Sequence, residues 1–168
     1  MATTEAWQRG PLPGFDPLLM PVVHALVQVQ EDLDRLASEV PPEHVWLRPG
    51  GAASIGFHAR HAAGALDRLL TYAKGEALTD PQRAFARREG DPGDPPATLA
   101  AVVAEARLLI EKAFEQLRAT KGLSLLDDRK IGRAELPTTV IGLLFHAAEH
   151  ATRHAGQAIT TAKILRGS

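Results

Sequence analysis

The sequence contains no cysteine, which excludes several kinds of chemistry at once. Without thiols the chain forms no disulfide, uses no thiolate nucleophile and offers no thiolate ligand to a metal ion. Histidine and carboxylate side chains are then the strong metal ligands that the chain itself can supply. A reaction that needs a thiol must receive it from a substrate.

The chain also lacks a basic excess, a signal-like amino terminus and a long apolar run. Its formal net charge is -1, so it has no basic surface of the kind that binds nucleic acid or an anionic membrane. The opening residues, MATTEAWQRGPLPG, have neither the basic start nor the apolar stretch of a signal peptide. No segment approaches the roughly 18 uninterrupted apolar residues of a membrane span. We therefore expect a cytoplasmic protein with no nucleic-acid and no membrane partner.

Aromatic residues are sparse, at 5% of the 168 residues, whereas 45% are hydrophobic. This composition is typical of helices that pack through leucine, valine and alanine. The length suits one domain with a real core and is short for two. We expect a single domain over residues 1–168.

Apolar residues recur at three- and four-residue spacing in four stretches, which is the pattern of amphipathic helices. The predicted helices are residues 16–40, about 53–75, about 96–120, and from Pro137 almost to the end of the chain. Each apolar stripe must be buried against the others, so the sequence predicts an all-α four-helix bundle.

The connections between these helices are long, and no alternating strand pattern of useful length appears in them. The stretch between the second and third helices is polar and rich in proline and glycine, so we interpret it as a solvated loop with room for one short helical turn. Its length, about 20 residues, is enough to cross the bundle. Spacing alone leaves the order of the helices open.

Two clusters contain five of the seven histidines: His58 with His61, and His146 with His150 and His154. Residues four apart on a helix lie above one another, so one pair on the last helix can direct both imidazoles at one ion. A third ligand must come from another helix. Three imidazoles with one position left for water or substrate form a catalytic type of site, and imidazole suits zinc, nickel and iron alike.

The same spacing also arises among hydrogen-bonded core histidines. It does not choose between residues 146/150 and 150/154 as the pair, or between His58 and His61 as the third ligand. His24 and His44 are expected to be structural or exposed.

Two segments, FHARHAAGALDRLLTYAKG and FHAAEHATRHAGQAITTAKIL, resemble the DinB-like family of metal-binding four-helix bundles, which is related to the YfiT-like thiol transferases. In that family a histidine of the second helix precedes a run of small residues and an acid, as His61 precedes AAGALD. The last helix carries H-x-x-x-H-x-G-Q, which HATRHAGQ matches from His150 to Gln157. With the upstream VWLRPGGAASIGFHARH and the four-helix layout, the resemblance covers nearly the whole chain.

The resemblance implies three ligands to a divalent metal ion: His61, His150 and His154. His58 and His146 then lie one turn away on the same helices, where they can donate hydrogen bonds or line the pocket. Gln157 either supports a ligand through a hydrogen bond or is polar surface, and Gly156 is interpreted as a point of close helix approach. Three charged neighbours of the expected ligands are interpreted as solvated helix residues outside the site: Arg60, Glu149 and Arg153.

The family resemblance also implies an up-down-down-up order, with the long connection as the crossover, and a homodimer. Some family members transfer bacillithiol, mycothiol or glutathione to electrophiles, and most have no assigned reaction. We therefore expect a small-molecule substrate, with a low-molecular-weight thiol as the candidate, and thiol transfer or metal-assisted hydrolysis as the reaction. Zinc or nickel is the expected metal, with iron and manganese as alternatives.

The alternative is a non-enzymatic stress-response or small-molecule-binding protein, whose metal site is structural or vestigial. A fourth protein ligand would favour it, because structural metal sites are closed and catalytic sites keep a position open. The sequence leaves open whether the protein is an enzyme.

Overall fold

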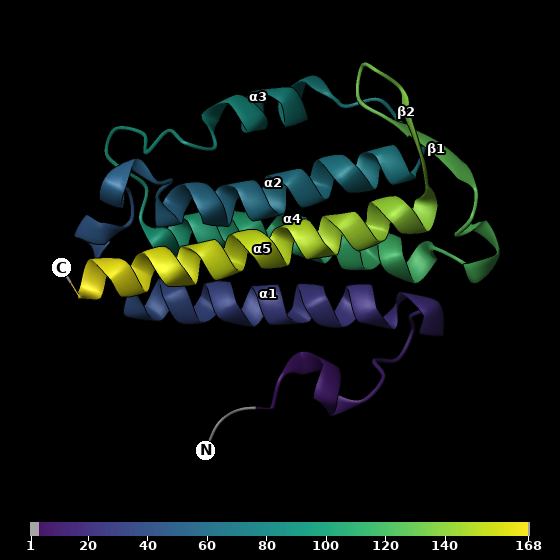
Figure 1. Ribbon diagram of the computed structural model, residues 1–168, viewed down its shortest axis with the longest axis horizontal. Coiled ribbons are helices and arrows are strands. Elements are labelled where there is room, and N and C mark those ends of the chain that lie inside the picture. Colours follow the sequence, from purple (N-terminus) through teal and green to yellow (C-terminus); the bar gives the residue numbers. More distant parts are fainter. Residues whose placement is uncertain (1–3, 168) are drawn as a thin grey trace.

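Four long helices lie side by side in the computed structural model, which describes residues 4–167 (Figure 1). They are α1 (Met20–Glu39), α2 (Ile55–Ala73), α4 (Leu99–Ala119) and α5 (Val140–Arg166). A shorter helix, α3 (Asp80–Arg88), lies against α2. The prediction of a mostly helical protein is confirmed.

Two of the long helices run in each direction, and the two that carry the histidine clusters, α2 and α5, run in opposite directions (Figure 1). α2 and α5 are antiparallel, because His58 contacts His154 near one end and His61 contacts His150 one turn further on. α2 and α4 run in the same direction and are joined by the chain segment that carries α3 (Figure 1). This segment crosses over the bundle and returns the chain to the end at which α2 began.

Polar residues mark where the long helices begin. The side chains of Ser54, Thr98 and Thr139 each accept a hydrogen bond from a backbone amide in the first turn of α2, α4 and α5 respectively. Such caps satisfy amides that have no partner inside the helix. They fix the register in which each helix, and each histidine on it, enters the bundle.

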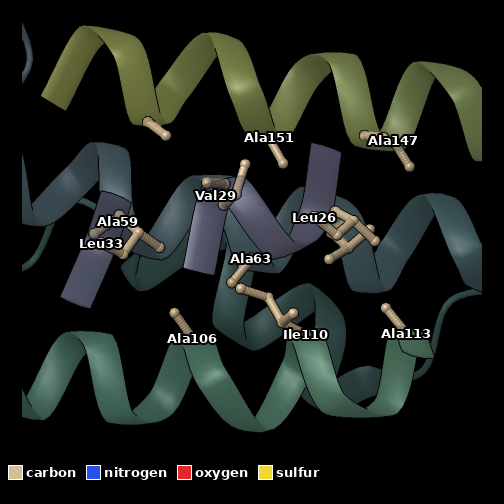
Figure 2. Packing of buried hydrophobic residues seen from close by; sticks show 14 of the residues in the cluster. Leu26, Val29, Leu33, Ala59, Ala63, Ala106, Ile110, Ala113, Ala147 and Ala151 are labelled. Carbon is tan, nitrogen blue, oxygen red and sulfur yellow. The ribbon is translucent and has the colours of Figure 1, made fainter. Parts of the chain in front are cut away.

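The core between the helices is built from aliphatic side chains and alanine (Figure 2). α1 and α4 contribute larger residues, including Leu26, Leu33 and Ile110, whereas many of the buried residues of α2 and α5 are alanines. The buried alanines of these two helices are Ala59, Ala62, Ala63, Ala65, Ala73, Ala147, Ala148, Ala151, Ala155, Ala158 and Ala162. Short side chains let helix backbones approach closely, so imidazoles on α2 and α5 come within reach of one another.

The connection before α5 contains a small sheet that the sequence pattern did not predict. β1 (Asp128–Ile131) pairs antiparallel with β2 (Leu136–Thr139). Each strand has four residues, and both are largely exposed, so no alternating apolar signal marks them. Pro137 therefore lies in β2, and the last helix begins at Val140 rather than at the predicted Pro137.

The crossover between α2 and α4 is also more ordered than predicted. Instead of a solvated loop with one short turn, it contains nine residues of helix, opened by a capping box between Thr79 and Gln82. Pro81 is compatible with this helix because the first turn needs no amide hydrogen from it. The residue that follows α3, Glu89, is buried.

None of the helices described between residues 4 and 167 combines the length with the apolar character that crossing a membrane requires.

Candidate metal centre

Three histidines from two helices converge on one point: His61 from α2, and His150 and His154 from α5. Each can offer one ring nitrogen such that the three nitrogens lie within 4.8 Å of one another. The Nε2 atoms of His61 and His150 are 3.0 Å apart. In a tetrahedral zinc site with Zn–N bonds of about 2.0–2.1 Å, the ligand nitrogens are separated by about 3.3 Å. Of the sets that the spacing left open, this one has the dimensions of a single-ion site.

The other histidines of the two clusters occupy different surroundings. His58 is buried, and its Nδ1 atom lies 3.0 Å from Nδ1 of His154. His146 has a half-exposed side chain, and its Nδ1 atom is 3.4 Å from a carboxylate oxygen of Glu149. Gln157 is exposed on α5. The structure thus places His58 within the cluster, and His146 at its outer edge.

Burial and mutual repulsion favour the neutral form of three imidazoles: His58, His150 and His154. Burial, followed by the charges of His61, His150 and His58, lowers the pKa of His154 from 6.5 to about 4. The pKa values of His150 and His58 are also lowered, in both cases chiefly by burial. A metal ligand must be unprotonated at the nitrogen that binds the ion, so the lowered pKa values of His150 and His154 suit a metal site.

Phe57 shields the cluster from one side. Its ring stacks on the imidazole of His61, with centroids 5.2 Å apart and planes 12° from parallel. The same ring meets His58 and His154 edge-on. The sequence analysis missed this residue, although it lies four positions before His61 and therefore on the same helix face.

Glu89 also touches the cluster, and the sequence analysis missed it as well. Its Oε2 atom lies 2.7 Å from Nδ1 of His61, and its Oε1 atom accepts a hydrogen bond of 2.7 Å from Arg68. Burial raises the pKa of the Glu89 carboxyl, but the hydrogen bonds from His61 and Arg68 outweigh burial, so the pKa is lowered overall. Glu89 is therefore an ionised carboxylate beside a candidate metal ligand.

Arg60, interpreted from the sequence as a solvated helix residue, is in fact buried, with 8% of its surface exposed. Its guanidinium lies over the ring of Trp46, 4.8 Å from the centroid, and donates a hydrogen bond to the carbonyl of Asp91. The prediction was wrong because the crossover covers this face of α2.

The remaining charged neighbours lie at the surface. Glu149 and Arg153 form an ion pair with each other along α5, in agreement with their interpretation as solvated helix residues. Gly156 is exposed, and a methyl group added to it would meet no other atom within 4 Å. The predicted close helix approach at Gly156 is therefore wrong.

The donor set fits a divalent metal ion. It consists of three imidazoles, and two of its outer ring nitrogens already have partners in His58 and Glu89. Among the described residues none is hydrogen-bonded to the buried Nδ1 atom of His150, so the outer nitrogen of this ring lacks the partner that the other two rings have. Such a set can hold zinc, nickel or a related ion.

Comparisons with known proteins bear on the family to which the chain belongs. A search among curated proteins found no significant match. The family model described as the DinB superfamily matches residues 25–158. This range includes the three convergent histidines and most of the chain. The protein therefore belongs to the DinB superfamily.

Proposed function

We propose that the protein binds a divalent metal ion through His61, His150 and His154, and that the ion serves a reaction on a small molecule. The observation that carries this proposal is the convergence of three ligand nitrogens within 4.8 Å from two separate helices. The side chain of His61 is 22% exposed, so a small molecule can reach the cluster from solvent. Zinc and nickel are the proposed metals, with iron and manganese as alternatives.

The proposed reaction is transfer of a low-molecular-weight thiol or metal-assisted hydrolysis. Three protein donors leave one position of a four-coordinate ion for an exogenous ligand. A metal ion held there would lower the pKa of water or of a thiol and so supply a nucleophile near neutral pH. The chain has no cysteine, so in the transfer reaction the thiol is a substrate. Phe57 would exclude water from one side of the cluster, while His58 and Glu89 would hold two of the rings.

A non-enzymatic role is the second candidate, and the position of His58 favours it. This fourth imidazole lies against His154, and if it also bound the ion it would close the coordination sphere. A closed site is typical of structural metals. In that case the ion would join α2 to α5 in a stress-response or small-molecule-binding protein.

The proposal extends to the whole molecule. The antiparallel contact of α2 with α5, and the crossover before α4, support an up-down-down-up bundle. We propose a cytoplasmic homodimer of such bundles. Light scattering at increasing protein concentration tests the dimer, and a mass that remains that of one chain would contradict it.

Metal analysis of freshly purified protein, combined with a screen of thiols and electrophiles, tests the function. We expect close to one divalent ion per chain, and an activity that is lost on chelation and restored by one metal. A protein that retains full activity in a verified metal-free state would exclude the metal-dependent reaction. A chain that binds no divalent ion at neutral pH would exclude the metal site itself.

A further inference from the structure

Two arginines of α2, one on each side of His61 in the sequence, form hydrogen bonds to the end of the crossover. Arg68, seven residues after His61 and towards the end of α2, donates a hydrogen bond to the carboxylate of Glu89. On the other side Arg60, which is buried, donates to the carbonyl of Asp91. The side chains of Arg60 and Arg68 are both largely buried. Their hydrogen bonds therefore fix the position of residues 88–91 relative to α2.

A glycine on α2 makes room for the carboxylate between these two contacts. A methyl group added to Gly64 would collide with Oε1 of Glu89 and would lie only 2.6 Å from Cε1 of Phe85. Real Cβ atoms do not approach other atoms so closely. The absence of a side chain at Gly64 therefore allows Glu89 to lie directly against the helix, within reach of His61.

Glu89 itself is 4% exposed, so its carboxylate depends on protein partners. Its two oxygens are used separately, one for Arg68 and one for Nδ1 of His61, each at 2.7 Å. A buried carboxylate is costly unless both its charge and its hydrogen-bonding capacity are satisfied. The contacts with Arg68 and His61 satisfy both the charge and the hydrogen-bonding capacity of the carboxylate. They also place Oε2 of Glu89 against Nδ1 of His61.

From these contacts we infer that Glu89 is a positioning residue, which fixes His61 in the tautomer with the proton on Nδ1 and so presents the lone pair of Nε2 to the metal. The inference rests on the proposed metal site. The carboxylate accepts only, so the ring nitrogen that faces it must carry the proton. In a neutral imidazole the other nitrogen, Nε2, is then unprotonated, and it is this atom that lies 3.0 Å from Nε2 of His150.

The effect of such a partner on metal binding is known in general terms. A carboxylate that accepts from the outer nitrogen of a histidine ligand fixes the ring and raises its basicity, and its loss costs about 10- to 100-fold in metal affinity. His61 is the single ligand contributed by α2. Its orientation therefore decides whether the two helices can share an ion.

The first test needs no metal. Long-range proton–nitrogen NMR of metal-free protein, with chelator present and at about pH 8.5 where imidazole is neutral, reports the tautomer of each histidine. His61→Asn assigns the signal. We expect the Nδ1–H tautomer for His61 in the wild type, and loss of this preference in Glu89→Gln. A wild-type His61 that carries its proton on Nε2 would overturn the inference, even if the variant does not fold.

The second test measures zinc and nickel affinity by calorimetry. Glu89→Gln should weaken binding about 10- to 100-fold, with circular dichroism unchanged. The matched control is Glu105→Gln, because Glu105 pairs with Arg60 and Arg88 of the same region but does not touch His61. The control should bind metal as the wild type does. Equal affinities for wild type and Glu89→Gln would overturn the inference.

The two tests separate this inference from the proposed function. If the wild type binds no metal but shows the Nδ1–H tautomer that Glu89→Gln loses, the proposed function fails and the positioning role stands. If the wild type binds metal and Glu89→Gln binds it equally well, the proposed metal site stands and the positioning role fails.

Discussion

The Nδ1 atom of His58 lies 3.0 Å from the Nδ1 atom of His154 across the α2–α5 contact. Two imidazole nitrogens at this distance form one hydrogen bond, in which one nitrogen carries the proton and donates while the other accepts. If His154 donates from Nδ1, its Nε2 atom keeps the lone pair that a metal ligand needs. His58 is buried, and burial lowers its pKa, so its ring is neutral near pH 7 and has one unprotonated nitrogen that can accept. His58 thus stands to His154 as Glu89 stands to His61.

Replacing His58 by phenylalanine should weaken metal binding without abolishing it. The ring volume is largely kept, while the acceptor for His154 is lost, so we expect affinity to fall by about 10- to 100-fold. Calorimetry with zinc measures it. His24→Phe is the control, because His24 is a partly buried histidine that bonds to the carbonyl of Gly10, away from the cluster. Unchanged zinc affinity in His58→Phe would show that His58 only fills space.

Removing a ligand should have a larger effect on metal-dependent stability than removing a neighbour. Metal at 100 times its dissociation constant stabilises the folded protein by about 2.7 kcal/mol. His154→Ala removes one of three donors and should abolish most of the metal-dependent rise in melting temperature. His146→Ala should leave most of that rise, because His146 is a half-exposed residue paired with Glu149.

Both variants must be melted with and without added metal, because loss of a buried ring can destabilise the apo protein through packing alone. The quantity compared is the shift that metal causes in each protein. Equal shifts in wild type and His154→Ala would exclude His154 as a ligand. A loss confined to His146→Ala would move the site one turn towards the start of α5.

Two glycines offer a matched test of the packing around the site. Gly64→Ala places a methyl group against Glu89 and Phe85, and such overpacking typically costs about 1–3 kcal/mol. Gly156→Ala adds a methyl group in open space on the exposed side of α5, where replacing glycine in a helix should stabilise by about 0.5–1 kcal/mol. Urea denaturation measures both free energies of unfolding. A Gly64→Ala protein as stable as Gly156→Ala would contradict the close approach of the crossover.

The four long helices could be predicted from the sequence because apolar residues recur in them at regular three- and four-residue spacing. Apolar residues such as Leu26, Leu33 and Ile110 recur at helical spacing, and each is buried. The convergence of His61 with His150 and His154 was accessible only through the family resemblance, since spacing alone left two pairs and two third ligands open. Antiparallel packing of α2 on α5 places His61 opposite His150, and with His154 these are the three that could share one ion.

The partners of the site could not be predicted from the sequence, because they come from a segment without a pattern. Glu89 lies in a polar stretch whose composition is that of a solvated loop, and Arg60 resembles any charged helix residue. Both are buried because the crossover folds onto α2. That contact depends on the space at Gly64, which no local periodicity reveals.

Acid should destabilise the metal-free protein through the same buried imidazoles. In the folded state the pKa of His154 is lowered from 6.5 to about 4, first by burial and then by the neighbouring imidazoles. As the pH falls below about 6.5 the unfolded chain takes up a proton on this ring, whereas the folded chain does so only near pH 4. The contribution of His154 to stability is therefore fully present above pH 6.5 and is lost progressively between pH 6.5 and 4.

His154→Asn tests this, because asparagine does not titrate. With chelator present, the wild type should lose more of its free energy of unfolding between pH 7.5 and pH 5 than the variant does, as measured by urea denaturation at each pH. Carboxylates and the other histidines titrate in both proteins, so the difference between the two slopes isolates His154. Metal added to the wild type should steepen the loss further, because protons compete with the metal for the same nitrogen atoms. Parallel pH profiles for the two metal-free proteins would mean that His154 is protonated as readily in the folded state as in the unfolded chain.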